Sequence, residues 1–418
     1  MPLTHKVRIM RTVDEHLSAI LSQVRPLEPF AISLLESRGG VIAEDVTAPW
    51  PLPVFDAAAV DGYAVIVSDI AKATIDAPVV LDVIASIDAG ERPTKGLYPG
   101  AAIAVTAGAI LPENTEAVIS KEHTEFDGSR LTVLQPAVVG QFVRRKAEDV
   151  AIGEVVATAG MTVDARLLGL LAAVGRQSVE ARPRPRVVVV SVGSELQEAG
   201  SAIEPGRIPD SNGVMLAAAV SEHGAVSYRV GPLASDVEKV AQTLEDQLVR
   251  ADLVLVTGGT SAKSYDVIAQ AMDTLGDVEF HRIAMTPGAA QGFGWLGDDN
   301  IPVMVLPGNP VAAFVSFEVF VRPVLRRLLG LSSERTQLVR AKLDGVVEST
   351  NDRRHYVRAT RYIGAGGVHM VKPLEEQGVH LVGGLARTEC LIVIPDAVTS
   401  LKHGDDVDVM LLSDFSMW

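Results

Sequence analysis

Three short segments end in the small and polar residues that suit an anionic ligand. Glycines let the backbone approach a ligand closely, and backbone N–H groups and hydroxyls can donate to phosphate. In "LPGNP" (306–310), the second proline can begin a helix, and an exposed helix N-terminus attracts phosphate. Each segment could instead be a plain strand-to-helix turn. The candidate binding residues are Ser211 and Asn212 of "DSNG", Gly258, Gly259, Thr260 and Ser261 of "TGGTS", and Pro307, Gly308, Asn309 and Pro310 of "LPGNP".

Several charged residues lie where they could act in chemistry. Glu195, in the segment "SVGSEL", lies at the end of a predicted strand that begins with a run of valines. Asp236 stands just before a predicted helix, where a role as N-cap competes with a catalytic one. Arg144 and Asp149 belong to the charged segment "VRRKAEDV", which is also typical of a solvated strand end. Asp61 precedes a glycine in "AVDGYAV", a pattern equally typical of a turn.

The segment "HRIAMTPGAAQGFG" (281–294) resembles an anion-binding turn. It combines Pro-Gly with Gly-x-Gly, so backbone N–H groups could face an oxyanion. From residue 283 to residue 294 it contains no Lys, Arg or His. An anion pocket here would lack its own cation.

Composition limits the class of protein. The chain has 418 residues, of which 48% are hydrophobic and 21% charged, and its net charge is −15. Such a charge makes binding to nucleic acid or to an anionic membrane surface unfavourable. The single cysteine, Cys390, excludes internal disulfides and cysteine-based zinc sites, and its apolar flanks predict a buried strand residue. No signal peptide and no membrane-spanning run is apparent, so we expect a cytoplasmic protein without direct membrane insertion.

Periodicity divides the chain into regions of different character. Residues 12–38 have helical spacing, residues 51–150 predict short strands and turns, and residues 165–175 predict a helix. From residue 187, strands and helices alternate, which predicts a parallel sheet covered on both faces. Ligands bind such sheets at the carboxyl ends of the strands, where "SVGSE", "TGGTS" and "LPGNP" fall. After residue 330, period-two alternation predicts a C-terminal β domain.

Together, and in this order, "FDAAAVDGYAV", "AGAILPENTEAVI", "VRRKAEDV", "SVGSEL", "GRIPDSNG", "TGGTSAKSYD", "MTPG" and "LPGNPVAAFVSFEVFVRPVL" resemble the MoeA/gephyrin E-domain family. The resemblance covers nearly the whole chain. It implies an α/β multidomain fold, with an elongated protomer of four subdomains, and a homodimer. The implied boundaries are 1–50 with 140–182 for a helical linker region, 51–139 for a small β domain, 183–330 for a MogA-like α/β domain, and 331–418 for the C-terminal β domain.

The resemblance also implies an activity, the insertion of molybdate into adenylated molybdopterin with Mg²⁺. The family's site lies between the α/β domain of one protomer and the small β domain of the other. Its catalytic residues match Asp61, Arg144, Asp149, Glu195 and Asp236 here. Of these, Glu195 and Asp236 would hold Mg²⁺, and molybdopterin would bind the turns named above.

This chain departs from the family where molybdate would bind. The family's "KPGKP" is "TPGAA" here, so Thr286 and Ala289 replace two lysines. Ser264 replaces an aspartate, and Lys263 replaces a glycine. A dianion in a water-poor pocket needs positive charge to offset its lost hydration. These replacements predict an eroded molybdate site.

Two functions therefore follow from the resemblance. In the first, the chain is a gephyrin-like scaffold that binds the C-terminal tail of the division protein FtsZ, which would recruit it to the septum; a membrane receptor is another partner that the family suggests. The matching groove residues are Tyr356, Leu17, Pro395 and Asp396. In the second, it is an active molybdopterin molybdenumtransferase in which Lys263, Arg144 and Mg²⁺ replace the missing lysines. A pterin or nucleotide sensor is a third alternative.

Overall fold

The computed structural model describes residues 8–258 and 262–412, and the chain divides into two compact units. The main unit comprises Met1–Phe30, Gly39–Val41 and Ala181–Trp418, and the second unit comprises Ala31–Arg38 and Ile42–Glu180. Each is described by itself below. Among the described residues, no helix is both long and apolar enough to span a membrane.

A seven-stranded sheet forms the centre of the main unit, in the order β1-β20-β22-β23-β19-β15-β18. Six strands point the same way, and β22 alone runs antiparallel to its neighbours. The strands are β1 (Arg8–Arg11), β15 (Arg186–Val192), β18 (Val226–Leu233), β19 (Leu253–Gly258), β20 (Gly276–Ile283), β22 (Ala290–Leu296) and β23 (Ile301–Pro307). The predicted parallel core is confirmed for β18, β15, β19 and β23. The sheet as a whole is mixed, because β20 and β22 form a hairpin that the sequence analysis interpreted as a turn.

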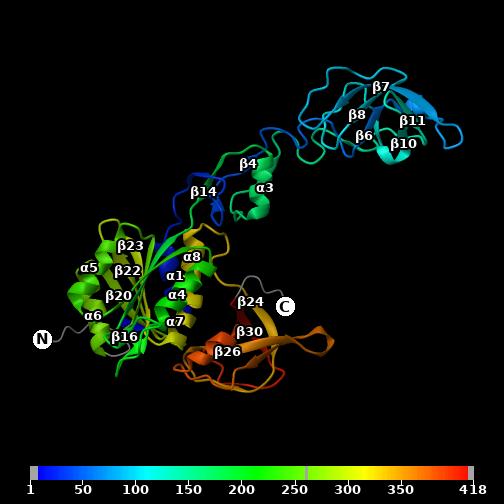
Figure 1. Cartoon of the computed structure of the whole chain (residues 1–418). Helices are drawn as coiled ribbons and strands as arrows, with labels where there is room; N and C mark the ends of the chain where they lie inside the picture. The colour runs from blue at the N-terminus through cyan, green and yellow to red at the C-terminus, as the bar shows by residue number, and fades with distance from the viewer. Residues whose placement is uncertain (1–7, 259–261, 413–418) are drawn as a thin grey trace. The chain divides into compact units, whose positions relative to one another are not determined.

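Helices cover both faces of this sheet (Figure 1). The side chains of Val187 and Val189 pack with α1, α4 and the α7–α8 helices, while Val188 and Val190 pack with α5 and α6. Burial on both faces explains why β15 is an unbroken run of valines instead of an alternating strand. The helices are α1 (Val13–Gln23), α4 (Ser211–Glu222), α5 (Val237–Leu248), α6 (Ala262–Asp273), α7 (Pro310–Ser316), a π-helical turn (Phe317–Val321) and α8 (Arg322–Leu328).

The predicted helical spacing over residues 12–38 is wrong beyond Gln23. A capping box starts α1, since Glu15 N–H donates to Thr12 Oγ1 at 3.2 Å while Thr12 N–H donates to Glu15 Oε2 at 2.8 Å. Pro26 and Pro29 follow α1, and each lacks an N–H and disfavours helical backbone in the residue before it. The chain then forms β2 (Phe30–Ser33).

The C-terminal part of the main unit is a six-stranded sheet in the order β21-β26-β27-β24-β30-β28. Cys390 lies in its core with no exposed surface, which confirms the predicted buried strand residue. The strands are β21 (Met285–Thr286), β24 (Leu338–Leu343), β26 (Arg354–Ile363), β27 (His369–Pro373), β28 (Cys390–Ile394) and β30 (Asp406–Leu411), with a separate pair β25 (Val347–Glu348) and β29 (Ser400–Leu401).

The second unit is built mainly of strands. Its six-stranded sheet has the order β10-β11-β7-β8-β6-β9, and the predicted helix over residues 165–175 is α3 (Ala165–Ala173), capped by Asp164. The sheet strands are β6 (Gly62–Val65), β7 (Val79–Ile87), β8 (Ala101–Val105), β9 (Ala117–Ser120), β10 (Thr124–Phe126) and β11 (Arg130–Val133). Short elements complete the chain: β3 (Val41–Ile42), β4 (Val46–Thr47), β5 (Ala57–Ala58), α2 (Val67–Ile70), β12 (Val143–Arg144), β13 (Val155–Ala157), β14 (Ser178–Arg182), β16 (Leu196–Gln197) and β17 (Ile208–Pro209).

Candidate functional site

A cavity of about 340 Å³ lies at the carboxyl ends of β15, β19 and β23. This is the edge where a parallel sheet binds its ligands. Seven predicted site residues line it together, namely Glu195, Ser211, Asn212, Gly258, Gly308, Asn309 and Pro310. Predicted residues Gly259, Thr260 and Ser261 lie outside the described residues, and Pro307 ends β23 without lining the cavity. The sequence analysis did not select Ser191, His380 or Val382, which also line it.

Asp210 fixes the start of α4 beside this cavity. Its Oδ1 accepts from Gly213 N–H at 2.9 Å, so the helix begins at Ser211, earlier than its apolar spacing alone indicates. Its Oδ2 lies 3.2 Å from Arg229 Nη2, and the side chain of Asp210 is almost wholly buried. Hydrogen bonds from Arg229 to Glu198, and then to Asp210, raise the pKa of Arg229. The Asp210 carboxylate is thus already paired within the chain.

Asn212 ties the ends of two strands to α4. Its Nδ2 donates to Thr257 Oγ1 at 2.9 Å and to Gly308 O at 2.8 Å. Two other polar atoms at the cavity, Asn212 Oδ1 and Ser191 Oγ, are buried without a hydrogen-bond partner. Buried polar atoms in native proteins nearly always have a partner, so this cavity fits a polar ligand.

The N-terminus of α7 is capped by the chain itself. Asn309 Oδ1 accepts from Val311 N–H at 3.2 Å and from Ala312 N–H at 3.4 Å, and Pro310 occupies the first helical turn as predicted. These two N–H groups are therefore already used, and the phosphate predicted for them would have to displace the Asn309 side chain.

Glu195 and Asp236 follow two serines that bind each other. Ser235 N–H donates to Ser194 Oγ at 3.0 Å, and Ser194 N–H donates to Ser235 Oγ at 3.2 Å. Glu195 lines the cavity, but Asp236 caps α5, its Oδ1 accepting from Lys239 N–H at 3.1 Å. The N-cap interpretation of Asp236 is confirmed. Within the described part of the chain, no three His, Cys, Asp or Glu residues are grouped so as to hold a metal ion, and Mg²⁺ binding by Glu195 and Asp236 stays a prediction.

Three family models match successive parts of the chain. Residues 11–175 match the MoeA N-terminal region (domain I and II), residues 188–327 the probable molybdopterin binding domain, and residues 340–412 the MoeA C-terminal region (domain IV). The chain belongs to the MoeA family.

Relatives and solved structures agree with this assignment. Molybdopterin molybdenumtransferase 1 of Mycobacterium tuberculosis is 36% identical, covering 97% of this chain and 99% of that protein. Molybdopterin molybdenumtransferase 2 of the same organism is 37% identical, covering 96% and 99%. The crystal structure of a molybdopterin biosynthesis MoeA protein from Pyrococcus horikosii matches with a TM-score of 0.78 and 30% identity, covering 98% of this chain and 100% of that one. The family and fold expected from the sequence are therefore confirmed.

The remaining predicted residues with MoeA counterparts lie in the second unit. Asp61 Oδ1 accepts from Ala107 N–H at 2.9 Å, and Asp61 Oδ2 lies 3.9 Å from Lys121 Nζ. Arg144 and Asp149 are exposed. Beside them, Arg145 pairs with Asp56 at 2.8 Å, a contact that sequence spacing did not indicate because the residues are 89 positions apart.

The segment 281–294 of this MoeA-family chain is not an open anion-binding turn. Ile283 N–H donates to Ala289 O at 2.7 Å, and Ala284 N–H donates to Arg11 O at 2.8 Å. Met285 and Thr286 form β21, which pairs with β26. The N–H groups of Ile283 and Ala284 are thus used within the chain and are not available to an oxyanion.

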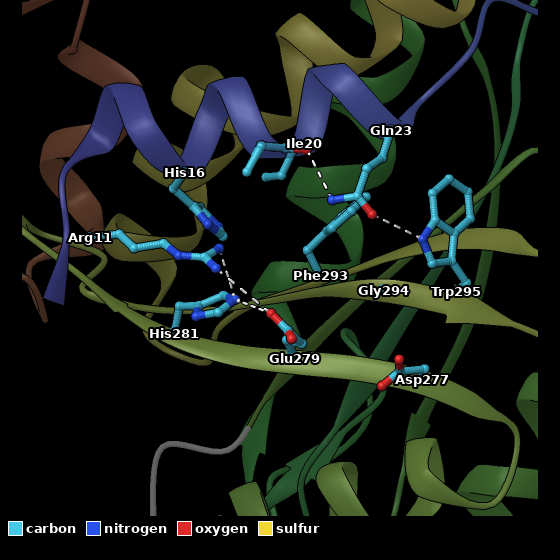
Figure 2. Close-up of a pocket in the computed structure, with 11 residues that line it drawn as sticks. Arg11, His16, Ile20, Gln23, Asp277, Glu279, His281, Phe293, Gly294 and Trp295 are labelled. Atoms are coloured by element: carbon cyan, nitrogen blue, oxygen red, sulfur yellow. Dashed lines mark hydrogen bonds and ion pairs between the residues drawn. The ribbon is translucent and has the colours of Figure 1, made fainter. Parts of the chain in front are cut away.

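A second cavity, of about 200 Å³, lies beneath α1 (Figure 2). Its charged groups face one another: Arg11 Nη1 lies 3.1 Å from His281 Nε2, which lies 3.1 Å from Glu279 Oε2. Burial lowers the pKa of His16 to about 3, so this imidazole stays neutral near pH 7. Because its Arg11, His281 and Glu279 already contact one another, this cavity is a weaker candidate for the MoeA substrate site than the strand-end cavity.

The predicted peptide-binding residues fall into two groups. Leu17 and Tyr356 are 6% and 5% exposed and belong to the core of the main unit, and burial raises the pKa of Tyr356 to about 12. Pro395 and Asp396 are exposed in the turn after β28. Only the second pair offers surface to a peptide in this chain, and the peptide site stays a prediction.

Proposed function

We propose that this chain is a molybdopterin molybdenumtransferase acting in molybdenum cofactor biosynthesis. The observation that carries the proposal is the strand-end cavity, which lies in the region matching the molybdopterin binding domain and contains two buried polar atoms without partners. The names of the M. tuberculosis relatives support the same activity. The second of the two functions expected from the sequence is thus the one we adopt.

The cavity suits a bound pterin in size and in rigidity. A volume of about 340 Å³ lies at the lower end of the range typical of small-molecule sites. Two hydrogen bonds of Asn212 and one from Thr257 Oγ1 to Pro307 O, at 2.9 Å, hold its walls in place. In the proposed reaction the bound molybdopterin receives molybdenum, and these residues hold and orient it.

We infer that the positive charge missing from the segment 281–294 comes from the start of β26 and the residue before it. β21 pairs with β26 so that Thr286 lies opposite His355, next to Arg353 and Arg354. Arg353 lies close enough to His355 to help lower its pKa, after burial as the main cause. Arg354 is held by Asp14 at 2.7 Å. Arg353 therefore offers a cation near the position of the lost lysine, which favours an oxyanion-handling function over complete erosion.

A turnover assay tests the proposal. Purified protein is incubated with adenylated molybdopterin, Mg²⁺ and molybdate, and released AMP and the reconstitution of an apo-molybdoenzyme are measured. We expect both to depend on molybdate. A relative that carries both lysines serves as the positive control, and no turnover in this chain under conditions where that relative is active would refute the proposal.

The scaffold function is not part of this proposal. Leu17 and Tyr356, two of its four predicted contacts, are buried in the described structure. The FtsZ tail remains a partner predicted from resemblance, and titration of the immobilised protein with that peptide tests it separately.

A further inference from the structure

The orientation of the Asn212 side-chain amide is fixed by its neighbours. The atom 2.8 Å from Gly308 O must be the NH₂ group, because a carbonyl oxygen can only accept. Thr257 Oγ1 donates its single proton to Pro307 O at 2.9 Å, so towards Asn212 it also can only accept. Both amide protons are thus used within the chain. A flipped amide would place oxygen against two acceptors.

This leaves Asn212 Oδ1 as a pure acceptor without a donor. Asn212 is 7% exposed and lines the cavity, and its Oδ1 has no partner in the described structure. Ser191, 1% exposed, also lines this cavity, and its Oγ is a second oxygen without a partner in the described structure. Half-buried Glu195 adds a carboxylate to the lining. Of these groups, the Asn212 oxygen and the Glu195 carboxylate can only accept, so the wall of the cavity offers more acceptors than donors.

An acceptor-rich wall selects against a phosphate and for an N–H edge. Phosphate oxygens carry negative charge and would be repelled by Asn212 Oδ1 and Glu195, whereas the aminopyrimidinone ring of a pterin carries N–H donors on one edge. The capped N-terminus of α7, next to Asn212 through Gly308, offers no free N–H at Val311 or Ala312 either. The deep part of the cavity is better matched to the heterocycle than to the phosphate.

We propose that Asn212 Oδ1 accepts a hydrogen bond from the 2-amino group of the pterin ring, making Asn212 the residue that selects a pterin by this donor and places the ring, not the phosphate, innermost. This inference rests on the proposed function, because it assumes that a pterin is the ligand. Ser191 Oγ, as donor or acceptor, completes the recognition of the same ring.

The test compares two ring systems that differ in donors. Pterin (2-amino-4-oxopteridine) carries the amino group, and lumazine (2,4-dioxopteridine) replaces it with an acceptor oxygen. Fluorescence titration of the wild-type protein with each compound should show pterin binding about tenfold more tightly or better, since a site built around a hydrogen bond rejects the analogue that lacks it. Equal affinities would overturn the inference without any mutation.

Variants locate the effect at Asn212. Asn212→Leu is expected to reduce the ratio of pterin to lumazine affinity to about one, while AMP binding stays unchanged. Ser221→Ala is the matched control, because Ser221 lies on the same helix, bonds only Ala217 O and Ser227 in the described structure, and does not line the cavity. If Asn212→Leu fails to fold, Thr257→Val removes the acceptor that fixes the amide and should lower the ratio too. Retained discrimination in a folded Asn212→Leu, or loss of AMP affinity instead of pterin affinity, would refute the inference.

The outcomes separate this inference from the proposed function. A wild-type protein that binds neither molybdopterin nor pterin contradicts both. A protein that turns over molybdopterin but binds pterin and lumazine equally keeps the function and loses the role of Asn212.

Discussion

Asp236 provides a sharp test of whether a family-matched carboxylate acts in chemistry or in helix capping. It is exposed at the start of α5, and its Oδ1 accepts from Lys239 N–H at 3.1 Å. Replacing an aspartate N-cap by alanine costs about 1 kcal/mol, and losing a negative charge at the helix N-terminus costs about 0.5 kcal/mol more. We therefore expect Asp236→Ala to lower the unfolding free energy of the main unit by about 1–2 kcal/mol. That corresponds to a drop in Tm of about 2 to 8 °C for a unit of this size.

Three substitutions separate the capping role from a catalytic one. Asp236→Ser and Asp236→Asn retain a side-chain oxygen for the cap, so urea unfolding should give free energies within about 0.5 kcal/mol of the wild type. Asp164→Ala is the matched control, because Asp164 caps α3 in the second unit at 2.9 Å and has no predicted catalytic role. The capping explanation predicts that Asp236→Ser also retains the molybdate-dependent release of AMP.

The opposite pattern would refute this reasoning. If Asp236→Ser unfolds like the wild type but loses turnover, or requires far more Mg²⁺, the carboxylate itself serves the reaction. The hydrogen bond to Lys239 would then be secondary, and the metal-binding prediction for Glu195 and Asp236 would be supported.

Three further predictions follow from buried or charged side chains. His16 has a pKa of about 3 in the fold, below its ordinary value of 6.5, so the unfolded chain binds the extra proton and stability falls as the pH drops below about 6.5. Between about pH 6.5 and about pH 4.5 the free energy of unfolding should fall by about 2 kcal/mol. His16→Leu should remove this difference when urea unfolding is measured at these two pH values. Burial raises the pKa of Cys390 to about 12, so a thiol reagent at about pH 8 should react only after denaturation, and prompt labelling of the native protein would contradict its placement. Arg353→Ala should raise the molybdate concentration needed for half-maximal turnover several-fold while leaving pterin affinity unchanged, and an unaltered molybdate requirement would show that Arg353 does not supply the missing charge.

Elements governed by local pattern were predictable from the sequence. The valine run of β15 requires burial on two faces, and the later alternation of strands and helices leads directly to the parallel core. The hairpin of β20 and β22 was missed because its glycines and Thr286-Pro287 resemble a turn locally. Its strand character depends on pairing with β23, which local spacing does not reveal. Helical spacing after Gln23 was misleading because two prolines override it.

The sequence was sufficient to predict that the candidate site lies at the carboxyl edge of the parallel sheet. It was not sufficient to predict the hydrogen bonds within the site. Strand direction brings "SVGSE" and "LPGNP" to one end of the sheet, so their meeting follows from topology. The hydrogen bond from Asn212 to Gly308 joins residues 96 positions apart, and no sequence signal indicates it. Likewise, the role of Asp210 as both cap and partner of Arg229 requires knowing that β18 lies beside β15.

The location of charge bears on whether the predicted erosion of the molybdate site is complete. The segment 281–294 contains no cation after Arg282, which by itself predicts the loss of oxyanion binding. Strand pairing, however, places His355 of β26 opposite Thr286, and Arg353 directly precedes β26, so residues about 70 positions away contribute to the electrostatic environment of this position. The inner cavity, in contrast, is lined by acceptors at Asn212 and Glu195. An acceptor-rich wall repels the same anion that an arginine attracts. The pterin ring and the molybdate oxyanion should therefore bind different surfaces of the protein. Arg353→Ala can then lower the affinity for molybdate without lowering the affinity for the pterin.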